Sequence, residues 1–235
     1  MRRILLFLCL IASSALFAQL PKNLLTPTTR VSLYDEYDGS IHMKSRYKES
    51  SVIDEKSGTF DAKLKYNIYS DALEYTSQSK LYEVVKSPTI HARIDGDYFY
   101  YCEFKNQRGS TRDGYYVLVE LTDRYRIYKR FTLKIKDPVD KGPITSGPTD
   151  PGILRMITTY YLEESGVIME LPMKKKEMLA AFNDKENELK DYLKKEKIRL
   201  RKEEDLIRLV ARYNALKSSD SSPSQSLLSN TDRGN

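Results

Sequence analysis

Residues 59–68 read TFDAKLKYNI, and every second position from Phe60 to Ile68 is apolar. Successive side chains of a β-strand point to opposite faces, so this alternation predicts a strand with one face on a core and the other in water. Strands of this kind are typical of antiparallel sheets. The segment therefore indicates a protein built on antiparallel β-structure.

The same two-residue pattern recurs along the chain as far as Lys136. Asp95-Gly96 lies between two alternating segments and predicts a hairpin, because glycine adopts positive φ at little cost. A further long alternation covers residues 125–136, and its outer face carries Lys and Arg. We expect a meander of seven to nine antiparallel strands, either sandwich-like or arranged as a partly open barrel.

From Lys174 onward, the apolar spacing changes to the three-to-four-residue period of a helix. Met178, Leu179 and Phe182 form the first apolar stripe, and Leu206 begins the last one. This pattern predicts a small C-terminal cluster of short helices. The expected fold class is therefore α+β.

Composition divides the chain into seven segments. Four prolines and three glycines fall within residues 137–152, a density that neither a helix nor an inner strand tolerates. We expect a signal peptide (1–18), a mostly irregular lead-in (19–57), an antiparallel β domain (58–136), a Pro/Gly-rich linker (137–152), a β-hairpin (153–172), a basic helical segment (173–215) and a disordered Ser-rich tail (216–235). The sequence leaves open whether the hairpin joins the main sheet, although a lone hairpin is marginal in water.

The first 18 residues have the pattern of a secretory signal peptide, with two arginines followed by an apolar run over residues 4–17. A helix of that length reaches about 21 Å, short of a bilayer core of roughly 30 Å. Cleavage is expected after Ala18 or Ala15. We therefore predict an exported protein, periplasmic or outer-membrane-associated, with no transmembrane helix in the mature chain. Lipidation at Cys9 is disfavoured by its bulky neighbours, and Cys102 alone cannot form an intramolecular disulfide.

The net charge of +6 is unevenly distributed. Residues 19–172 carry 22 basic and 22 acidic side chains, whereas residues 173–214 carry 13 and 9. A basic surface attracts acidic partners, but acids interleaved with the bases also fit an ordinary solvated helical face. The balanced charge of the β region and the predicted export argue against nucleic acid as a partner.

The sequence offers little for catalysis. It has two histidines, His42 and His91, and lacks the GxSxG, HExxH and CxxC patterns of nucleophilic and metal sites. We predict no catalytic, cofactor-binding or metal-binding residues and therefore no enzyme. Acids such as Asp97 and Glu103, together with exposed tyrosines, keep open the alternative of a glycan-binding protein or a carbohydrate-active enzyme.

Binding is the favoured role, because the many strand tyrosines cannot all face one side of a sheet. We expect a non-catalytic interaction or accessory protein of the cell envelope that binds a protein partner through outer strand faces and a basic helical patch. The candidate partner-binding residues are Tyr101, Tyr116, Tyr128, Arg126, Arg130, Lys134, Lys174, Lys175, Lys176, Lys194, Lys195, Arg199 and Arg201. A further alternative is a peripheral protein whose basic helices lie on anionic lipid.

Three stretches carry a family resemblance: LKYNIYSDALEY (64–75), YYLEESGVIMELPMKKKEMLAAFNDK (160–185) and KKEKIRLRKEEDLIRLVARYN (194–214). In these patterns the chain resembles a group of uncharacterised exported β-rich proteins of Bacteroidota. The resemblance covers about two thirds of the mature chain. It implies a periplasmic or outer-membrane-associated location in a Gram-negative cell and carries no site residues.

Overall fold

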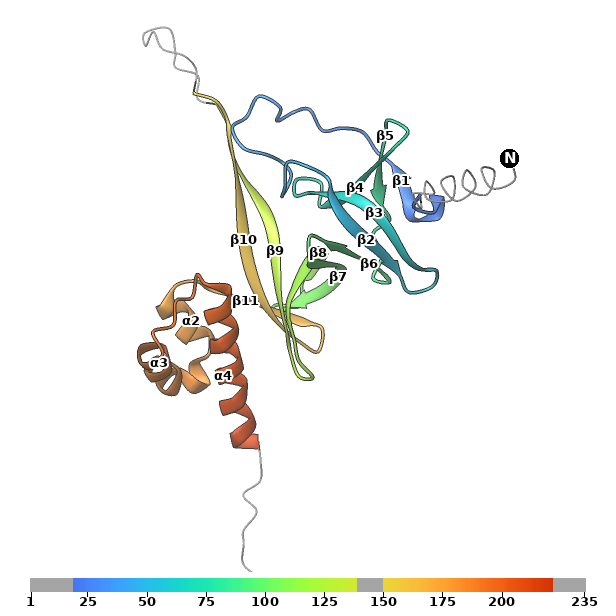
Figure 1. Cartoon of the computed structure of the whole chain (residues 1–235). Helices are drawn as coiled ribbons and strands as arrows, with labels where there is room; N and C mark the ends of the chain where they lie inside the picture. Colours follow the sequence, from blue (N-terminus) through green and yellow to red (C-terminus); the bar gives the residue numbers. More distant parts are fainter. Residues whose placement is uncertain (1–18, 139–149, 222–235) are drawn as a thin grey trace, which may run out of the picture. The chain divides into compact units, whose positions relative to one another are not determined.

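The computed structural model describes residues 19–138 and 150–221, and the chain divides into two compact units (Figure 1). A β unit extends to Glu170, and a helical unit begins at Leu171. The predicted signal peptide, most of the predicted linker and residues 222–235 of the predicted tail lie outside the described residues.

Most elements follow one another with short connections, and the longer ones join β1 to β2 and β9 to β10. The strands are β1 (Leu25–Pro27), β2 (Lys48–Asp54), β3 (Gly58–Asn67), β4 (Ala72–Ser77), β5 (Lys80–Val84), β6 (Ile90–Ile94), β7 (Asp97–Asn106), β8 (Thr111–Leu121), β9 (Arg126–Lys136), β10 (Ile153–Glu164) and β11 (Val167–Leu171). The helices are the 3₁₀ turn η2 (Lys22–Leu24), α2 (Lys175–Ala181), the 3₁₀ turn η3 (Asn183–Lys185), α3 (Glu186–Lys195) and α4 (Glu203–Ser221). The predicted α+β class, with antiparallel strands followed by short helices, is confirmed.

The strands form one sheet in the order β1-β5-β4-β3-β2-β6-β7-β11-β10-β9-β8, and β8 also pairs with β7. Because β8 pairs with β7 as well as with β9, the five strands β7, β8, β9, β10 and β11 form a closed ring. Within the ring, the pairs β7–β8, β8–β9 and β9–β10 are antiparallel, and the pair β7–β11 is parallel. The predicted hairpin joins the sheet, since β10 pairs with β9 from Ile153 to Glu163 and the two form a long ribbon (Figure 1).

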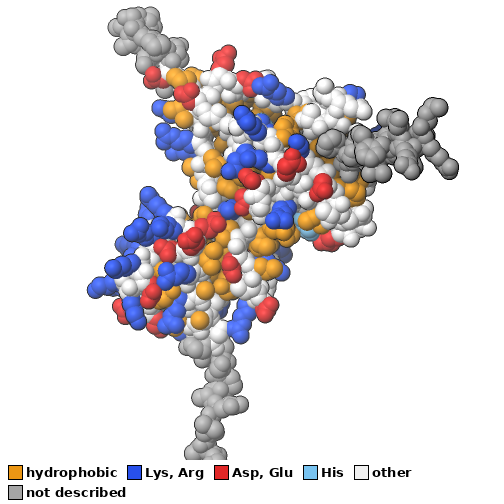
Figure 2. Space-filling view, in the orientation of Figure 1, with side chains coloured by type: hydrophobic (Ala, Val, Ile, Leu, Met, Phe, Trp, Pro, Cys, Tyr) orange, Lys and Arg blue, Asp and Glu red, His pale blue; other side chains and the backbone are white. Residues whose placement is uncertain are grey.

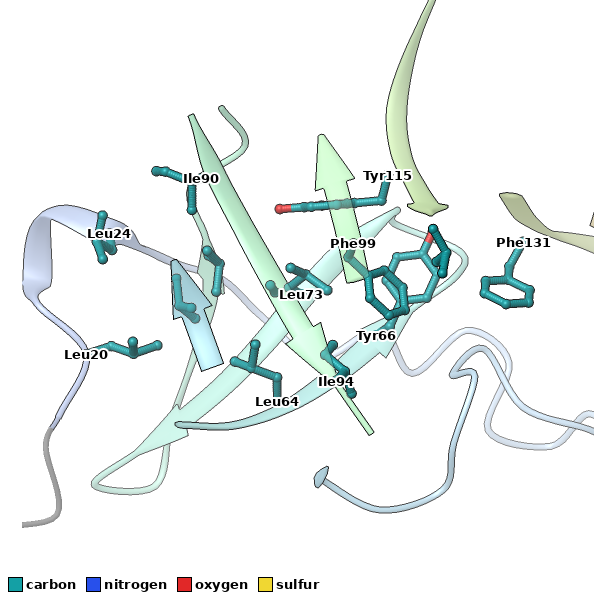
Figure 3. Close-up of a cluster of buried hydrophobic side chains, with 14 of the residues drawn as sticks. Leu20, Leu24, Leu64, Tyr66, Leu73, Ile90, Ile94, Phe99, Tyr115 and Phe131 are labelled. Atoms are coloured by element: carbon teal, nitrogen blue, oxygen red, sulfur yellow. The ribbon is translucent and has the colours of Figure 1, made fainter. Parts of the chain in front are cut away.

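One core cluster lies under the open part of the sheet and reaches the ring (Figure 3). The rings of Tyr66 and Phe99 pack with centroids 5.1 Å apart, and Tyr115 and Phe131 lie beside Tyr66 at 6.1 and 6.3 Å. Leu64 at the centre of the same cluster is fully buried. The alternation that predicted β3 thus does place its apolar face on a core.

A second cluster fills the ring with one side chain from each of its strands: Phe104, Tyr116, Tyr128, Tyr161 and Ile168. The aromatic centroids lie 5.0–6.0 Å apart, mostly edge to face, which is a preferred aromatic geometry. The ring is therefore a packed aromatic core.

The lead-in is more regular than predicted. It contributes β1 at one end of the sheet and β2 at its centre, paired on one side with β3 and on the other with β6. Its pattern was hidden because Ser50 and Asp54 occupy buried positions of β2 beside the buried Val52. Asp54 compensates for its burial by accepting bonds from Lys56 N and the Ser57 hydroxyl.

The helical unit has its own core, in which Met178, Phe182, Leu189 and Leu206 are fully buried. The Phe182 ring stacks on Tyr213 of α4 with centroids 4.1 Å apart. Helix α4 continues to Ser221, so the predicted disordered tail does not begin at residue 216. Within the described residues, none of the helices combines the length and apolar character that crossing a membrane requires.

Candidate interaction surfaces

Two of the three tyrosines predicted to lie on an outer strand face are buried. Tyr116 is 0% exposed and Tyr128 6% exposed, and both point into the ring. Ile127 next to Tyr128 is buried as well, so β9 is covered on both faces at this point. The prediction that Tyr116 and Tyr128 are exposed is therefore wrong, because closure of the ring turns their strand faces inward.

Tyr101 is half-exposed, but its hydroxyl is engaged. It donates to Asp113 Oδ2 at 2.7 Å across the β7–β8 pair. This bond, followed by desolvation, raises the pKa of Tyr101 to about 12. The same bond lowers the pKa of Asp113. The Tyr101 ring also packs on Tyr115 with centroids 5.5 Å apart, so both its ring and its hydroxyl make contacts within the sheet.

The predicted basic strand surface contains two structural arginines and one unpaired lysine. Arg126 lies 3.1 Å from Glu163, whose side chain is 3% exposed, and Glu163 also accepts from Gly166 N in the β10–β11 turn. Arg130 lies 3.1 Å from Asp71 and is half-buried. Lys134 is exposed and makes no ion pair among the described residues. Lys134 and Arg126 are both exposed, but the guanidinium of Arg126 is already paired with Glu163, whereas Lys134 has no ion pair with a described residue.

The Arg130–Asp71 pair belongs to a network that ties the β3–β4 turn to β8 and β9. Asp71 accepts from the Tyr66 hydroxyl at 2.6 Å and from Tyr115 N at 3.2 Å. Gly114 has φ +144°, and a Cβ there would lie 2.4 Å from atoms of both Arg130 and Asp71. The absence of a side chain at Gly114 is therefore what lets the two charges meet.

The helical patch is defined as Lys174, Lys175, Lys176, Lys194, Lys195, Arg199 and Arg201, and each of these residues is exposed. Figure 2 shows Lys and Arg side chains gathered over the surface of the helical unit. Lys174 lies 2.8 Å from Glu177. Within the part of the chain that the structure describes, the other six make no ion pair.

Helix electrostatics explain only part of this patch. Lys194 and Lys195 lie in the last turn of α3, where cations stabilise the helix. Lys175 and Lys176 lie in the first turn of α2, at the positive end of the helix dipole, where cations are unfavourable. Folding of α2 therefore gives no reason for a run of three lysines.

The acids considered for glycoside chemistry do not form a pair. Asp97 and Glu103 lie six residues apart on β7, about 20 Å along a strand. Glycosidase carboxylates lie roughly 5–9.5 Å apart. Asp97 instead lies 3.3 Å from Lys129 of β9. These two acids therefore lack the geometry that the alternative required.

No family model, no curated protein and no solved structure matches this chain. The resemblance to exported proteins of Bacteroidota accordingly stays a prediction.

Proposed function

We propose that this chain is a non-catalytic, exported accessory protein of the cell envelope that binds an acidic protein partner through the helical patch. The observation that supports this is a surface of seven exposed cations on a compact helical unit, six of which make no ion pair with any residue that the structure describes. Unpaired like charges repel one another, so a protein gains from such a surface when something acidic covers it.

The β unit would serve as the body that carries this surface. Its basic and acidic side chains balance, and some of its cations, such as Arg126, Arg130 and Lys129, pair with acids of other strands or turns. The exposed Lys134 and the half-exposed Tyr101 add secondary contacts in this proposal. The main determinant of binding in this proposal is nevertheless the helical patch.

Capture from envelope extracts tests the proposal. Immobilised mature chain is compared with a variant in which all seven patch cations are changed to Gln, and captured proteins are identified by mass spectrometry. A protein held by the first and lost by the second is purified, and its association rate is measured. We expect charge removal to slow association by about 10- to 1,000-fold and added salt to have the same direction of effect.

A matched control removes as many cations from the β unit: Lys44, Arg46, Lys56, Lys80, Lys105, Arg108 and Arg155, all of which are exposed. This variant should keep the partner and the association rate. Equal loss in both variants would mean a non-specific charge effect and would contradict the proposal. Recovery of only free monomer at low salt would contradict it as well.

The same unpaired cations also favour a second candidate, attachment to an anionic lipid surface. Flotation with phosphatidylglycerol vesicles distinguishes the two. Binding to vesicles that is lost in the patch variant, with no protein captured, would favour the lipid surface over the protein partner.

A further inference from the structure

A cavity of about 550 Å³ opens in the β unit between the lead-in and strands β3, β4 and β5. Its size lies within the roughly 300–1,000 Å³ range of small-molecule sites. The lead-in supplies Arg30, Tyr34, His42 and Tyr47, and the sheet supplies Lys65 and Glu74. This site is separate from the helical patch and uses none of its residues.

A buried carboxylate, that of Glu74, lines the cavity, and each of its two oxygens has a hydrogen-bonding partner. Glu74 is 7% exposed, and its Oε1 accepts from Asn67 Nδ2 at 2.7 Å. His42 Nε2 lies 2.9 Å from Glu74 Oε2. Burial raises the pKa of Glu74, but the contacts with His42 and Asn67 outweigh it and leave the pKa below its usual value. An ionised carboxylate, whose oxygens each have a second lone pair, is therefore fixed in place as an acceptor.

His42 is itself held by the backbone. It forms an isolated antiparallel bridge with Asn67, and its N–H donates to Ser40 Oγ at 3.0 Å. This bridge fixes the lead-in to β3 beside the cavity. His42 of the lead-in and Glu74 of β4 therefore belong to one hydrogen-bonded structure.

Two aromatic rings line the cavity, and neither is loose. Tyr34 packs edge to face on Tyr37 and Tyr69, with centroids 5.1 and 4.9 Å apart. The Tyr47 hydroxyl accepts from Thr76 Oγ1 at 2.8 Å, and the Lys65 ammonium lies 5.7 Å from the Tyr47 ring centroid. Rings held in this way offer apolar contact area at a low cost in entropy.

The charges around the cavity cancel. Arg30 lies 2.9 Å from Asp35, and Lys65 stands directly across from Glu74 in the β3–β4 register. Two cations thus face two acids, which gives neither an anion nor a cation an electrostatic advantage. What remains is a set of hydrogen-bonding groups next to two fixed aromatic rings.

We propose that this cavity binds a neutral saccharide. A sugar ring has apolar C–H faces that pack on tyrosine and a rim of hydroxyls that donate to a carboxylate and accept from an ammonium. Tyr34 and Tyr47 offer the aromatic contact, Glu74 accepts from a hydroxyl, and Lys65 donates to one. The site differs from the strand tyrosines considered in the sequence analysis, and its two carboxylates, Asp35 and Glu74, are each in contact with a basic side chain.

A glycan array carrying neutral and acidic glycans tests the proposal on the mature chain, with titration calorimetry on the neutral glycan that is best retained. We expect Tyr47→Ala to weaken binding at least about ten-fold, because it removes a stacking surface. Glu74→Gln should have an effect of similar size, because it removes a charged acceptor. Lys65→Met should also weaken binding, because it removes a donor to a sugar hydroxyl while leaving the buried Glu74 in place.

Tyr98→Ala serves as the matched control, because Tyr98 is an exposed tyrosine of the β unit outside the cavity. It should bind as the unaltered chain does, and so should the patch variant with seven Gln substitutions. Retention of no neutral glycan, a preference for acidic glycans, or loss in Tyr98→Ala but not in Tyr47→Ala would each overturn the proposal. None of these results bears on the protein partner, so the two proposals fail separately.

Discussion

The β unit and the helical unit use their charges in different ways. In the β unit, Arg126, Arg130 and Lys129 each lie 3.1–3.3 Å from a carboxylate and connect strands or turns. In the helical unit, six of the seven patch cations have no ion pair among the residues described. The β unit also has exposed cations without an ion pair among the described residues, so pairing alone does not separate the two units. The comparison teaches that the helical unit differs by its excess of cations over acids, whereas the ion pairs of the β unit join strands and turns that are distant in sequence.

The substitution with the largest expected effect, Phe182→Ala, tests whether the two units are stable independently of each other. Phe182→Ala removes a fully buried ring stacked on Tyr213 and should destabilise the helical unit by about 3–5 kcal/mol. A unit of this size holds only about 3–7 kcal/mol in total. We therefore expect circular dichroism to show loss of helix while the β unit persists.

Cys102 reports on the β unit in the same experiment. Burial raises the pKa of its thiol to about 12, so a thiol reagent should react slowly until β7 is exposed. Its labelling rate in the mature Phe182→Ala chain should match that of the unaltered chain. Faster labelling would show that the two units unfold together. Ile207→Ala, at a half-buried position of α4, should leave the helices folded.

The next effect tests whether charges in the β unit are structural. Arg130→Met leaves Asp71 without its cation, and urea denaturation should show a loss of about 2–3 kcal/mol in the free energy of unfolding. Lys134→Met on the same strand should change it by less than about 0.5 kcal/mol, because Lys134 makes no ion pair with any described residue. Equal effects of the two substitutions would remove the contrast between paired and unpaired cations.

A smaller effect concerns pH. The folded state lowers the pKa of Glu74, so this group stabilises the protein above its unfolded pKa, and the contribution is lost as pH falls through the folded pKa. The melting temperature of Glu74→Gln should lie below that of the unaltered chain near neutral pH. The two melting temperatures should converge under acidic conditions. A constant difference at every pH would mean that the charge of Glu74 plays no part.

The smallest effect is local to one hydrogen bond. Asp113→Asn removes the charge that, through its bond to the Tyr101 hydroxyl, raises the pKa of this tyrosine to about 12. NMR titration should then give a Tyr101 pKa closer to the ordinary value of about 10. An unchanged pKa would show that desolvation, the lesser cause, is sufficient.

The strands that the sequence predicted are those with clean alternation. Residues 59–68 and 125–136 became β3 and β9 because each places an apolar row on a core. Strand β2 escaped prediction, since buried polar residues such as Ser50 break its alternation. The change to a helical period at Lys174 located the helical unit within a residue or two.

The sites were harder to predict, because they depend on long-range pairings. The exposure of the helical patch follows from local helix geometry. The burial of Tyr116 and Tyr128 instead depends on the pairing of β7 with both β8 and β11, which local patterns do not reveal. The cavity was missed because the lead-in, which supplies His42 and Tyr47, has no regular period.

Strand β7 joins the open part of the sheet to the ring, since it pairs with β6, β8 and β11. Two of these neighbours adjoin it in sequence, but β11 follows only about 60 residues after the paired Lys105. Contacts between such distant positions are slow to form, because the intervening loop must first be closed. Ring closure should therefore be the late kinetic event in folding of the β unit. Until β11 has been synthesised, newly made chains would expose the unpaired edge of β7, which chaperones can bind.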